Sequence, residues 1–238
     1  MKNSIQDEFI STVSHEMRTP LTSIRGFSQT LLSSWDRIDD ENKKKFIKII
    51  EDQSNRLINL VENILTVSKA NAGNLVMKKV LINASIRSII PMFQEQYKAH
   101  KFVFASQNDL PPARLDDDKF QQIMTNLIDN GCKYSSEGST ITITTESKGE
   151  YIVIKVKDEG VGIRKEDAEK LFKKFSRIEN HLTSKTQGNG LGLYITKQLV
   201  DSMNGNITFE SEENKGSTFS VTFPVYNPEE VLKCSQKS

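Results

Sequence analysis

The sequence is poor in cysteine, with only Cys132 and Cys234 among 238 residues. Two isolated cysteines form neither a disulfide framework nor a metal-ligand cluster, which favours a reducing compartment, and we expect a cytoplasmic location. The sequence also lacks an apolar run long enough to span a bilayer, and it predicts no signal peptide. We therefore expect no membrane segment in this chain, whereas a longer parent protein is left open.

The chain has no excess of charge of either sign, because 32 basic residues stand against 31 acidic ones and leave a net charge of +1. This balance gives no reason to expect nucleic acid or an anionic membrane as a partner. Hydrophobic residues make up 36% and charged residues 26%, which is typical of a soluble globular protein. The length is that of one or two domains.

Apolar residues recur at helical spacing in two segments near the start of the chain, residues 4–33 and 40–70. A polar loop separates them; Asp40 is suited to cap the second helix and Gly73 to end it. The pair predicts a helical hairpin with one long apolar seam, which a hairpin alone does not bury. Dimerisation into a four-helix bundle would bury the seam, and so would packing against the rest of the same chain.

The first helix carries His15, Glu16 and Thr19 away from its apolar stripe, and Pro20 follows directly. Positions 15 and 19 are neighbours on a helix surface, and so are 16 and 19. Pro20 predicts a bend at this point, because its ring pushes against the carbonyl of Glu16. A histidine, a carboxylate and a hydroxyl therefore lie together, although a solvated polar face with an incidental proline has the same pattern.

Short alternating apolar segments follow and predict strands at 75–77, 101–104, 140–144, 151–156, 205–209 and 217–223. Helical periodicity between them predicts helices near 83–99, 117–134, 166–172 and 190–203. This mixture indicates an α/β sandwich, a mixed sheet covered on one face by helices. We expect one domain at residues 1–72, a second at 73–226, and a polar tail at 227–238.

Asn126, Asn130 and Lys133 share one face of the predicted helix at 117–134, at positions i, i+4 and i+7. Amide oxygens can ligate a hard cation such as Mg²⁺, and a lysine can contact phosphate. A polar outer face of the helix is an equally good interpretation of this segment taken alone.

Two glycine-rich segments mark the second half of the chain. Asp158 precedes Gly160 and Gly162 after a predicted strand, where a tight turn would offer a carboxylate to a ligand with amino donors, although an ordinary turn looks similar. Residues 188–193 open a helix with the pattern G-x-G-x-G, which leaves N–H groups for a phosphate. The dinucleotide pattern G-x-G-x-x-G and the P-loop pattern are absent, which argues against those two nucleotide folds.

Between these segments, Phe172 and Phe175 enclose two lysines, and Arg177 follows. A long polar loop between an aromatic pair and a phosphate-binding glycine cluster is typical of a lid, with cations near the phosphates. Core packing is the simpler interpretation for at least one of the two phenylalanines.

Taken together, the motifs resemble those of the catalytic core of two-component sensor histidine kinases. The matching segments are the H box His-Glu-Met-Arg-Thr-Pro at 15–20, the N box at 126–134, the first glycine box at 158–162, the F box at 172–175, the second glycine box at 188–192 and a small-residue box at 216–219. The resemblance covers about residues 5 to 225, and the ordered series is far more specific than any one motif. A small departure is Gly131, where alanine is frequent.

For the first domain, the resemblance implies a dimerising hairpin in which His15 accepts phosphate and Glu16 is its acid–base partner. Phospho-His15 would then donate to an aspartate on a response-regulator receiver domain. Thr19 resembles the position that orients a water for dephosphorylating that partner in bifunctional members.

For the second domain, the resemblance implies an ATP-binding fold shared with gyrase, a chaperone and mismatch-repair ATPases. Asn130 would bind Mg²⁺, and Asp158 would accept from the adenine amino group. The other residues that the resemblance assigns to ATP are Asn126, Lys133, Tyr134, Gly160, Gly162, Phe175, Arg177, Gly188, Gly190, Leu191 and Gly192.

The leading hypothesis is therefore an ATP-dependent, autophosphorylating protein-histidine kinase that acts as a homodimer. A chaperone- or gyrase-like ATPase would share the nucleotide fold, but it would leave the helix of residues 4–33 unexplained. A third hypothesis is a degenerate module that binds ATP and serves as a dimeric scaffold. The intact Asn130, Asp158 and glycine boxes argue against it.

Overall fold

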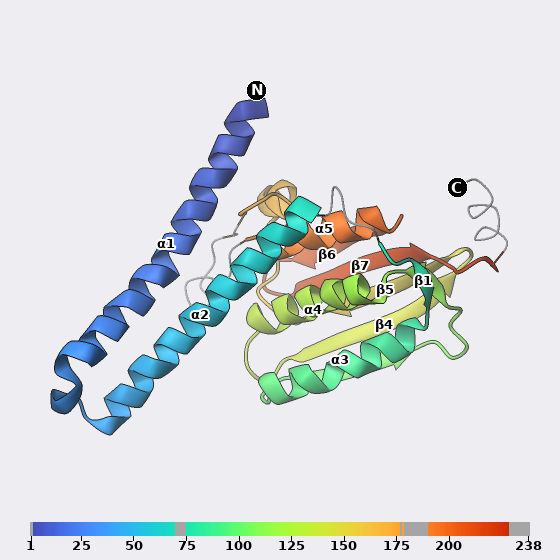
Figure 1. Cartoon of the computed structure of the whole chain (residues 1–238). Helices are drawn as coiled ribbons and strands as arrows, with labels where there is room; N and C mark the ends of the chain where they lie inside the picture. The colour runs from blue at the N-terminus through green and yellow to red at the C-terminus, as the bar shows by residue number, and fades with distance from the viewer. Residues whose placement is uncertain (1, 70–74, 177, 179–189, 229–238) are drawn as a thin grey trace. The chain divides into compact units, whose positions relative to one another are not determined.

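The structure, a computed structural model, describes residues 2–69, 75–176, 178 and 190–228 (Figure 1). It divides into two compact units, Met1–Lys69 and Ala70–Ser238. The predicted boundary at residues 72 and 73 falls outside the described residues, as does most of the predicted tail. Each unit is described by itself.

The first unit is a helical hairpin made of α1 (Lys2–Ser34), the 3₁₀ turn η1 (Trp35–Arg37) and α2 (Asp40–Lys69). α1 continues as one helix through Pro20. The cap of α2 is Asp39, whose carboxylate accepts the backbone N–H of Asn42 at 2.8 Å. The predicted cap, Asp40, is instead the first residue of the helix, because two adjacent aspartates give the same capping signal one residue apart.

Apolar side chains of α1 and α2 meet along the hairpin. The rings of Phe27 and Phe46 have centroids 5.1 Å apart, and Leu31 is buried. Several other apolar side chains of the hairpin are exposed, among them Leu21, Ile47, Ile58 and Leu65. The hairpin therefore leaves much of its apolar surface uncovered.

The second unit alternates helices and strands. Its helices are α3 (Ile82–Gln96), α4 (Asp117–Lys133) and α5 (Gly192–Ser202), with the 3₁₀ turn η2 (Lys165–Lys170). Its strands are β1 (Lys78–Val80), β2 (Lys101–Ser106), β3 (Ala113–Leu115), β4 (Thr140–Lys148), β5 (Tyr151–Lys157), β6 (Asn206–Glu212) and β7 (Gly216–Pro224).

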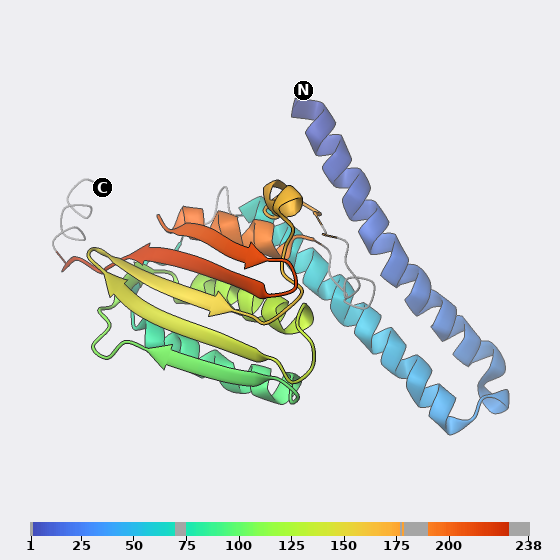
Figure 2. The ribbon, with the colours of Figure 1, turned by 180° about the vertical axis from the view of Figure 1, so that it is seen from behind.

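Five strands form a mixed sheet in the order β2-β4-β5-β7-β6. β2 and β4 run parallel, and every other neighbouring pair in this sheet is antiparallel. α3, α4 and α5 lie together over one face of the sheet, and Figure 2 shows the opposite face from behind. The α/β sandwich expected from the sequence is confirmed.

Side-chain alternation explains how the sheet and α4 pack. In β4, Ile141 and Ile143 are buried whereas Thr142 between them is half-buried. The apolar side of α4 packs in the core, with Phe120, Ile123, Leu127 and their apolar neighbours buried. α4 contacts both α3 and α5, so its remaining polar face is held at a fixed place beside the sheet.

The start of the second unit differs from the prediction. Residues 75–77 form no strand; β1 begins at Lys78 and pairs with β3, which the sequence does not predict. The backbone N–H of Val76 donates instead to the Asp116 carboxylate at 2.9 Å, next to the N-terminus of α4. Three-residue strands are too short for alternation to show, so their position cannot be read from the pattern. The helix predicted at 166–172 is the 3₁₀ turn η2.

In the described part of the chain, no helix is both long enough and apolar enough to cross a membrane.

Gly131 gives a test of the packing of α4 on the sheet. A Cβ at this buried position would lie 3.3 Å from Ile141 Cδ1 and 3.5 Å from Asp158 Cβ. Alanine is about 1 kcal/mol better than glycine inside a helix, and Ile141 Cδ1 is the end of a flexible side chain. Gly131→Ala should therefore raise the free energy of unfolding by about 1 kcal/mol, measured by urea denaturation of the second unit in the full chain.

The matched control repeats Gly131→Ala in an Ile141→Val background, which removes the Cδ1 atom that the new methyl group meets. The gain should be at least as large there. A loss of stability in both backgrounds would show that α4 lies closer to the sheet than described.

Candidate functional site

The polar face of α4 holds three of the predicted residues. The Asn126 amide donates to the Gly192 carbonyl and to Thr196 Oγ1, both at 3.4 Å, so it ties α4 to the start of α5. The half-buried side chain of Asn130 makes no hydrogen bond with any residue that the structure describes. The Asn130 amide oxygen is therefore available to a ligand. Lys133, further along the same face, has its Nζ 2.5 Å from Asp129 Oδ2.

Asp158 follows β5 and is only 6% exposed. Its Oδ1 accepts the backbone N–H of Gly160 at 2.9 Å and that of Ser217 at 3.0 Å. Within the described residues, its Oδ2 accepts no hydrogen bond. Burial raises the pKa of this carboxyl, and the two N–H groups oppose the rise. The site thus holds a fixed, largely desolvated carboxylate with one oxygen unused.

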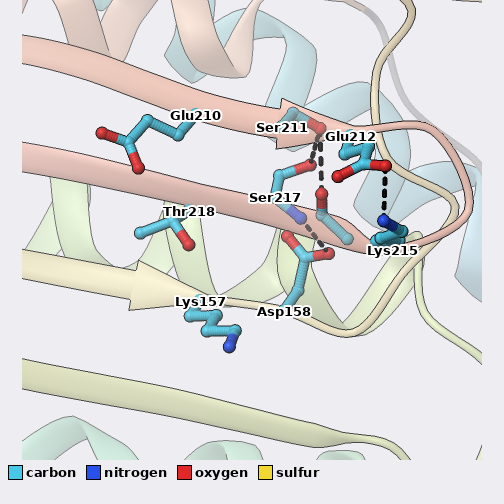
Figure 3. A pocket seen from close by; sticks show the side chains of 9 residues that line it. Lys157, Asp158, Glu210, Ser211, Glu212, Lys215, Ser217 and Thr218 are labelled. Atoms are coloured by element: carbon cyan, nitrogen blue, oxygen red, sulfur yellow. Dashed lines mark hydrogen bonds and ion pairs between the residues drawn. The ribbon is translucent and has the colours of Figure 1, made fainter.

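Figure 3 shows Asp158 at a pocket between the end of β5 and the hairpin of β6 and β7. Ser211 of β6 joins these segments: its Oγ lies 2.9 Å from Ser217 Oγ, donates to the Gly216 carbonyl at 3.0 Å and accepts the N–H of Ile163 at 2.8 Å. Ser211 is absent from the predicted site, because a lone serine on a strand carries no motif. The small-residue box at 216–219 is the nearest signal in the sequence.

Close backbone contacts explain two of the predicted glycines. A Cβ at Gly160 would collide with the carbonyl oxygen of Tyr134, which also accepts the N–H of Val161 at 3.1 Å. A Cβ at Gly190, whose φ is +68°, would lie 2.7 Å from the carbonyl carbon of Phe175. These contacts join the loop after β5 to the end of α4, and the F box to the second glycine box.

The described residues of the predicted nucleotide site therefore belong to connected parts of the second unit. They are Asn126, Asn130, Lys133, Tyr134, Asp158, Gly160, Gly162, Phe175, Gly190, Leu191 and Gly192. Leu191 is buried at the start of α5, and Phe172 packs edge-on against Phe209 with centroids 6.1 Å apart. Arg177, Gly188 and the polar loop predicted as a lid lie outside the described residues, apart from the first position of that loop.

His15 lies on α1 with an exposed side chain. The next residue, Glu16, is less exposed; its Oε2 lies 3.4 Å from Nη2 of Arg56 on α2. Thr19 Oγ1 donates to the His15 carbonyl at 3.4 Å, a long hydrogen bond that leaves the hydroxyl accessible. The hairpin thus presents a histidine to solvent beside a carboxylate that the other helix restrains. Arg56 is not predicted, because its contact links residues far apart in sequence.

No group of three or more histidine, cysteine, aspartate or glutamate side chains gathers as a metal site among the residues that the structure describes. The amide oxygen of Asn130 is of a kind that ligates a hard cation together with oxygens of the cation's other ligands.

Two family models match the chain. The model described as "His Kinase A (phospho-acceptor) domain" matches residues 5–73, and the one described as "Histidine kinase-, DNA gyrase B-, and HSP90-like ATPase" matches residues 115–227. The first of these regions contains His15, and the second contains Asp158.

Curated relatives extend the similarity over nearly the whole chain. Sensor histidine kinase WalK of Bacillus subtilis is 35% identical over 233 residues, which are 94% of this chain and 37% of WalK. Signal transduction histidine-protein kinase ArlS of Staphylococcus haemolyticus is 33% identical over 220 residues, 92% of this chain and 48% of ArlS. The chain therefore spans less than half the length of these two relatives.

Among solved structures, histidine kinase ThkA in complex with response regulator protein TrrA superposes with a TM-score of 0.76 at 29% identity. The match covers 96% of this chain and 64% of that one.

The buried Asp158 carboxylate makes a testable contribution to stability. Because its pKa is raised on folding, folding becomes less favourable as the pH rises from the ordinary range of an aspartic acid through the raised value. Asp158→Asn removes the charge and keeps an oxygen for the two N–H donors. The nucleotide-free variant should therefore melt at a higher temperature than the wild type at neutral pH.

The difference in melting temperature should shrink as the pH falls through the raised pKa of the wild-type carboxyl, because the folded protein then takes up the proton. Thermal scans by circular dichroism from neutral to acidic pH measure the melting temperatures of the wild type and the variant. A variant that melts lower than the wild type at neutral pH would mean that the carboxylate is stabilising, against this description of the site.

Proposed function

Because the chain belongs to the family of two-component sensor histidine kinases and carries their catalytic core, we propose that it transfers the γ-phosphoryl group of ATP to His15. From there the group passes to an aspartate on the receiver domain of a response regulator. The observation that carries this proposal is the buried Asp158 carboxylate with its unused oxygen, in the same chain as an exposed histidine beside a restrained glutamate. We place this activity in the cytoplasm, where ATP is found.

Asp158 is the residue that selects the base. Its Oδ1 is occupied by two backbone N–H groups, so Oδ2 is the atom that accepts a hydrogen bond from the adenine amino group. Gly160 and Gly162 bring the loop after β5 close to the neighbouring backbone and so shape the adenine pocket. A carboxylate kept in a buried site against its solvation preference supports a role in binding.

The phosphates extend from the base toward α4 and the start of α5. Lys133 and Tyr134 contact them from the end of α4, and Asn126 supports this face through its bonds to α5. Residues of the F box and second glycine box complete the phosphate side and the lid: Phe175, Arg177, Gly188, Gly190, Leu191 and Gly192. The N-terminus of α5, which begins at Gly192, is suited to an anion.

The residues present fit a magnesium ion that arrives with ATP. Asn130 supplies an amide oxygen without a partner in the described structure, and Mg²⁺ in such sites takes few protein ligands besides substrate phosphates. When bound, the ion would offset negative charge on the phosphate oxygens.

In the transfer step, a neutral His15 ring uses the lone pair of one nitrogen to attack the γ-phosphorus in line. The new N–P bond forms as the bond between the γ-phosphorus and the bridging oxygen of ADP breaks. Glu16 accepts a hydrogen bond from the other ring nitrogen, fixes the tautomer and stabilises the positive charge that develops on the ring. Arg56 restrains the Glu16 carboxylate from the neighbouring helix.

Phospho-His15 lies on an exposed surface, so a receiver domain can approach it. The complex of ThkA with TrrA supports a partner of this kind. Thr19 has an accessible hydroxyl one turn beyond His15 and is suited to orient a water for removing phosphate from the regulator. The proposal therefore includes a phosphatase activity that removes the phosphate from the response regulator.

The hairpin also supports a homodimer. Exposed apolar side chains such as Leu21, Ile47, Ile58 and Leu65 lie on both helices. A second copy of the hairpin would bury them in a four-helix bundle.

Incubation with γ-labelled ATP and Mg²⁺ tests the proposed function. The wild type should take up label that is lost in acid and stable in base, as expected of phosphohistidine, and His15→Ala should give only background. His15→Ala should keep the wild-type shift in melting temperature on adding ATP, because the nucleotide site lies in the other unit.

Two outcomes would refute it. Equal labelling of the wild type and His15→Ala would place the phosphate elsewhere. Steady release of phosphate from ATP that survives His15→Ala, without label on the wild type, would indicate an ATPase instead.

A further inference from the structure

A chain of two short contacts connects α3 to the lysine of the N box. The Tyr97 hydroxyl donates to Asp129 Oδ1 at 2.6 Å, and Asp129 Oδ2 lies 2.5 Å from Lys133 Nζ. Tyr97 directly follows α3 as its C-cap, whereas Asp129 and Lys133 are one turn apart on α4. Each carboxylate oxygen therefore has one partner, one at the end of α3 and the other on α4.

Tyr97 is itself held by the core of the unit. Its ring stacks on Phe93, which is almost fully buried, with centroids 6.5 Å apart, and it meets the edge of His100 at 5.7 Å. Burial, then the Asp129 carboxylate, raises the pKa of Tyr97, so the phenol keeps its proton and remains a donor. The hydroxyl is a fixed anchor for Asp129.

This anchor changes what the lysine–aspartate pair can do. An isolated pair at i and i+4 on a helix surface is weak, because both side chains must give up rotamer freedom to meet. Here one oxygen of Asp129 is already fixed by Tyr97, so the second oxygen presents a stationary acceptor to Lys133. The lysine side chain is 34% exposed, and its ammonium has two further donors for a ligand.

Lys133 lies three residues after Asn130, on the same side of α4. We propose that Asp129 and Tyr97 are positioning residues that hold the Lys133 ammonium in place for the nucleotide phosphates before ATP arrives. The inference rests on the proposed function, in which Lys133 binds those phosphates. The rotational freedom of the lysine is then lost on folding rather than on binding, which favours ATP binding.

The predicted effect is on the binding of ATP more than on the chemical step. Lys133 contacts the phosphates both before and during transfer, so losing its position weakens both states. Asp129→Asn and Tyr97→Phe should each raise the apparent KM for ATP in His15 labelling by about three- to tenfold, with kcat nearly unchanged. Asp129→Glu, which keeps the charge, should restore part of the loss.

A double variant separates positioning from a general effect on folding. Asp129→Asn should add little to the KM of Lys133→Gln, because both changes remove the same contact. The matched control is Asp201→Asn, which breaks the Lys197–Asp201 pair on α5, also at i and i+4, with Nζ to Oδ1 at 2.8 Å and a lysine that is 33% exposed. This control should leave the KM for ATP unchanged.

The outcomes are distinct. If Lys133→Gln raises KM but Asp129→Asn and Tyr97→Phe do not, the inference is wrong and the proposed function stands. A lower KM in Asp129→Asn would show that the carboxylate competes with ATP for the lysine, which also overturns it. Additive effects in the double variant would reveal a merely structural role. A wild type that takes no label on His15 refutes the proposed function, and this inference with it.

Discussion

The proposed nucleotide site depends on the hydrogen bonds of one buried carboxylate, that of Asp158. Desolvation of a carboxylate is costly, and two backbone N–H groups, from Gly160 and Ser217, offset part of that cost. These bonds fix the end of β5 to the start of β7 and set the loop against the carbonyl of Tyr134 at the end of α4. Without the carboxylate, the segments of the proposed adenine pocket would share fewer contacts.

α4 connects the loop after β5 to the rest of the unit, because its two sides differ. One side of it is core, and the other carries the amides of Asn126 and Asn130 with Lys133. Its beginning is capped by the Asp116 carboxylate, its middle bonds to α5 through Asn126, and Asp129 bonds to Tyr97 at the end of α3. These three contacts hold the polar face in place along the length of the helix, and the proposed phosphoryl transfer depends on such positioning.

Much of this arrangement could be predicted from the sequence, because local patterns determine it. The helical hairpin, the main sheet strands and the family follow from periodicity and from motifs in a fixed order. The wrong predictions come from local ambiguities. Asp39 caps α2 in place of its neighbour Asp40, and residues 75–77 form no strand, because the N–H of Val76 bonds to Asp116 instead. The contacts of Tyr97, Arg56 and Ser211 join residues distant in sequence, and no local pattern encodes those.

In the proposed site, Asp158 Oδ2 accepts a hydrogen bond from the amino group of adenine. Guanine carries a carbonyl oxygen at the position where adenine carries that amino group, so it would face the carboxylate with a second acceptor. Calorimetric titration of the nucleotide-free protein with ATP and with GTP, both with Mg²⁺, tests this most directly. ATP should bind saturably, and GTP should bind more weakly by at least about a hundredfold. Equal affinity for the two nucleotides would contradict a hydrogen bond from adenine to Asp158.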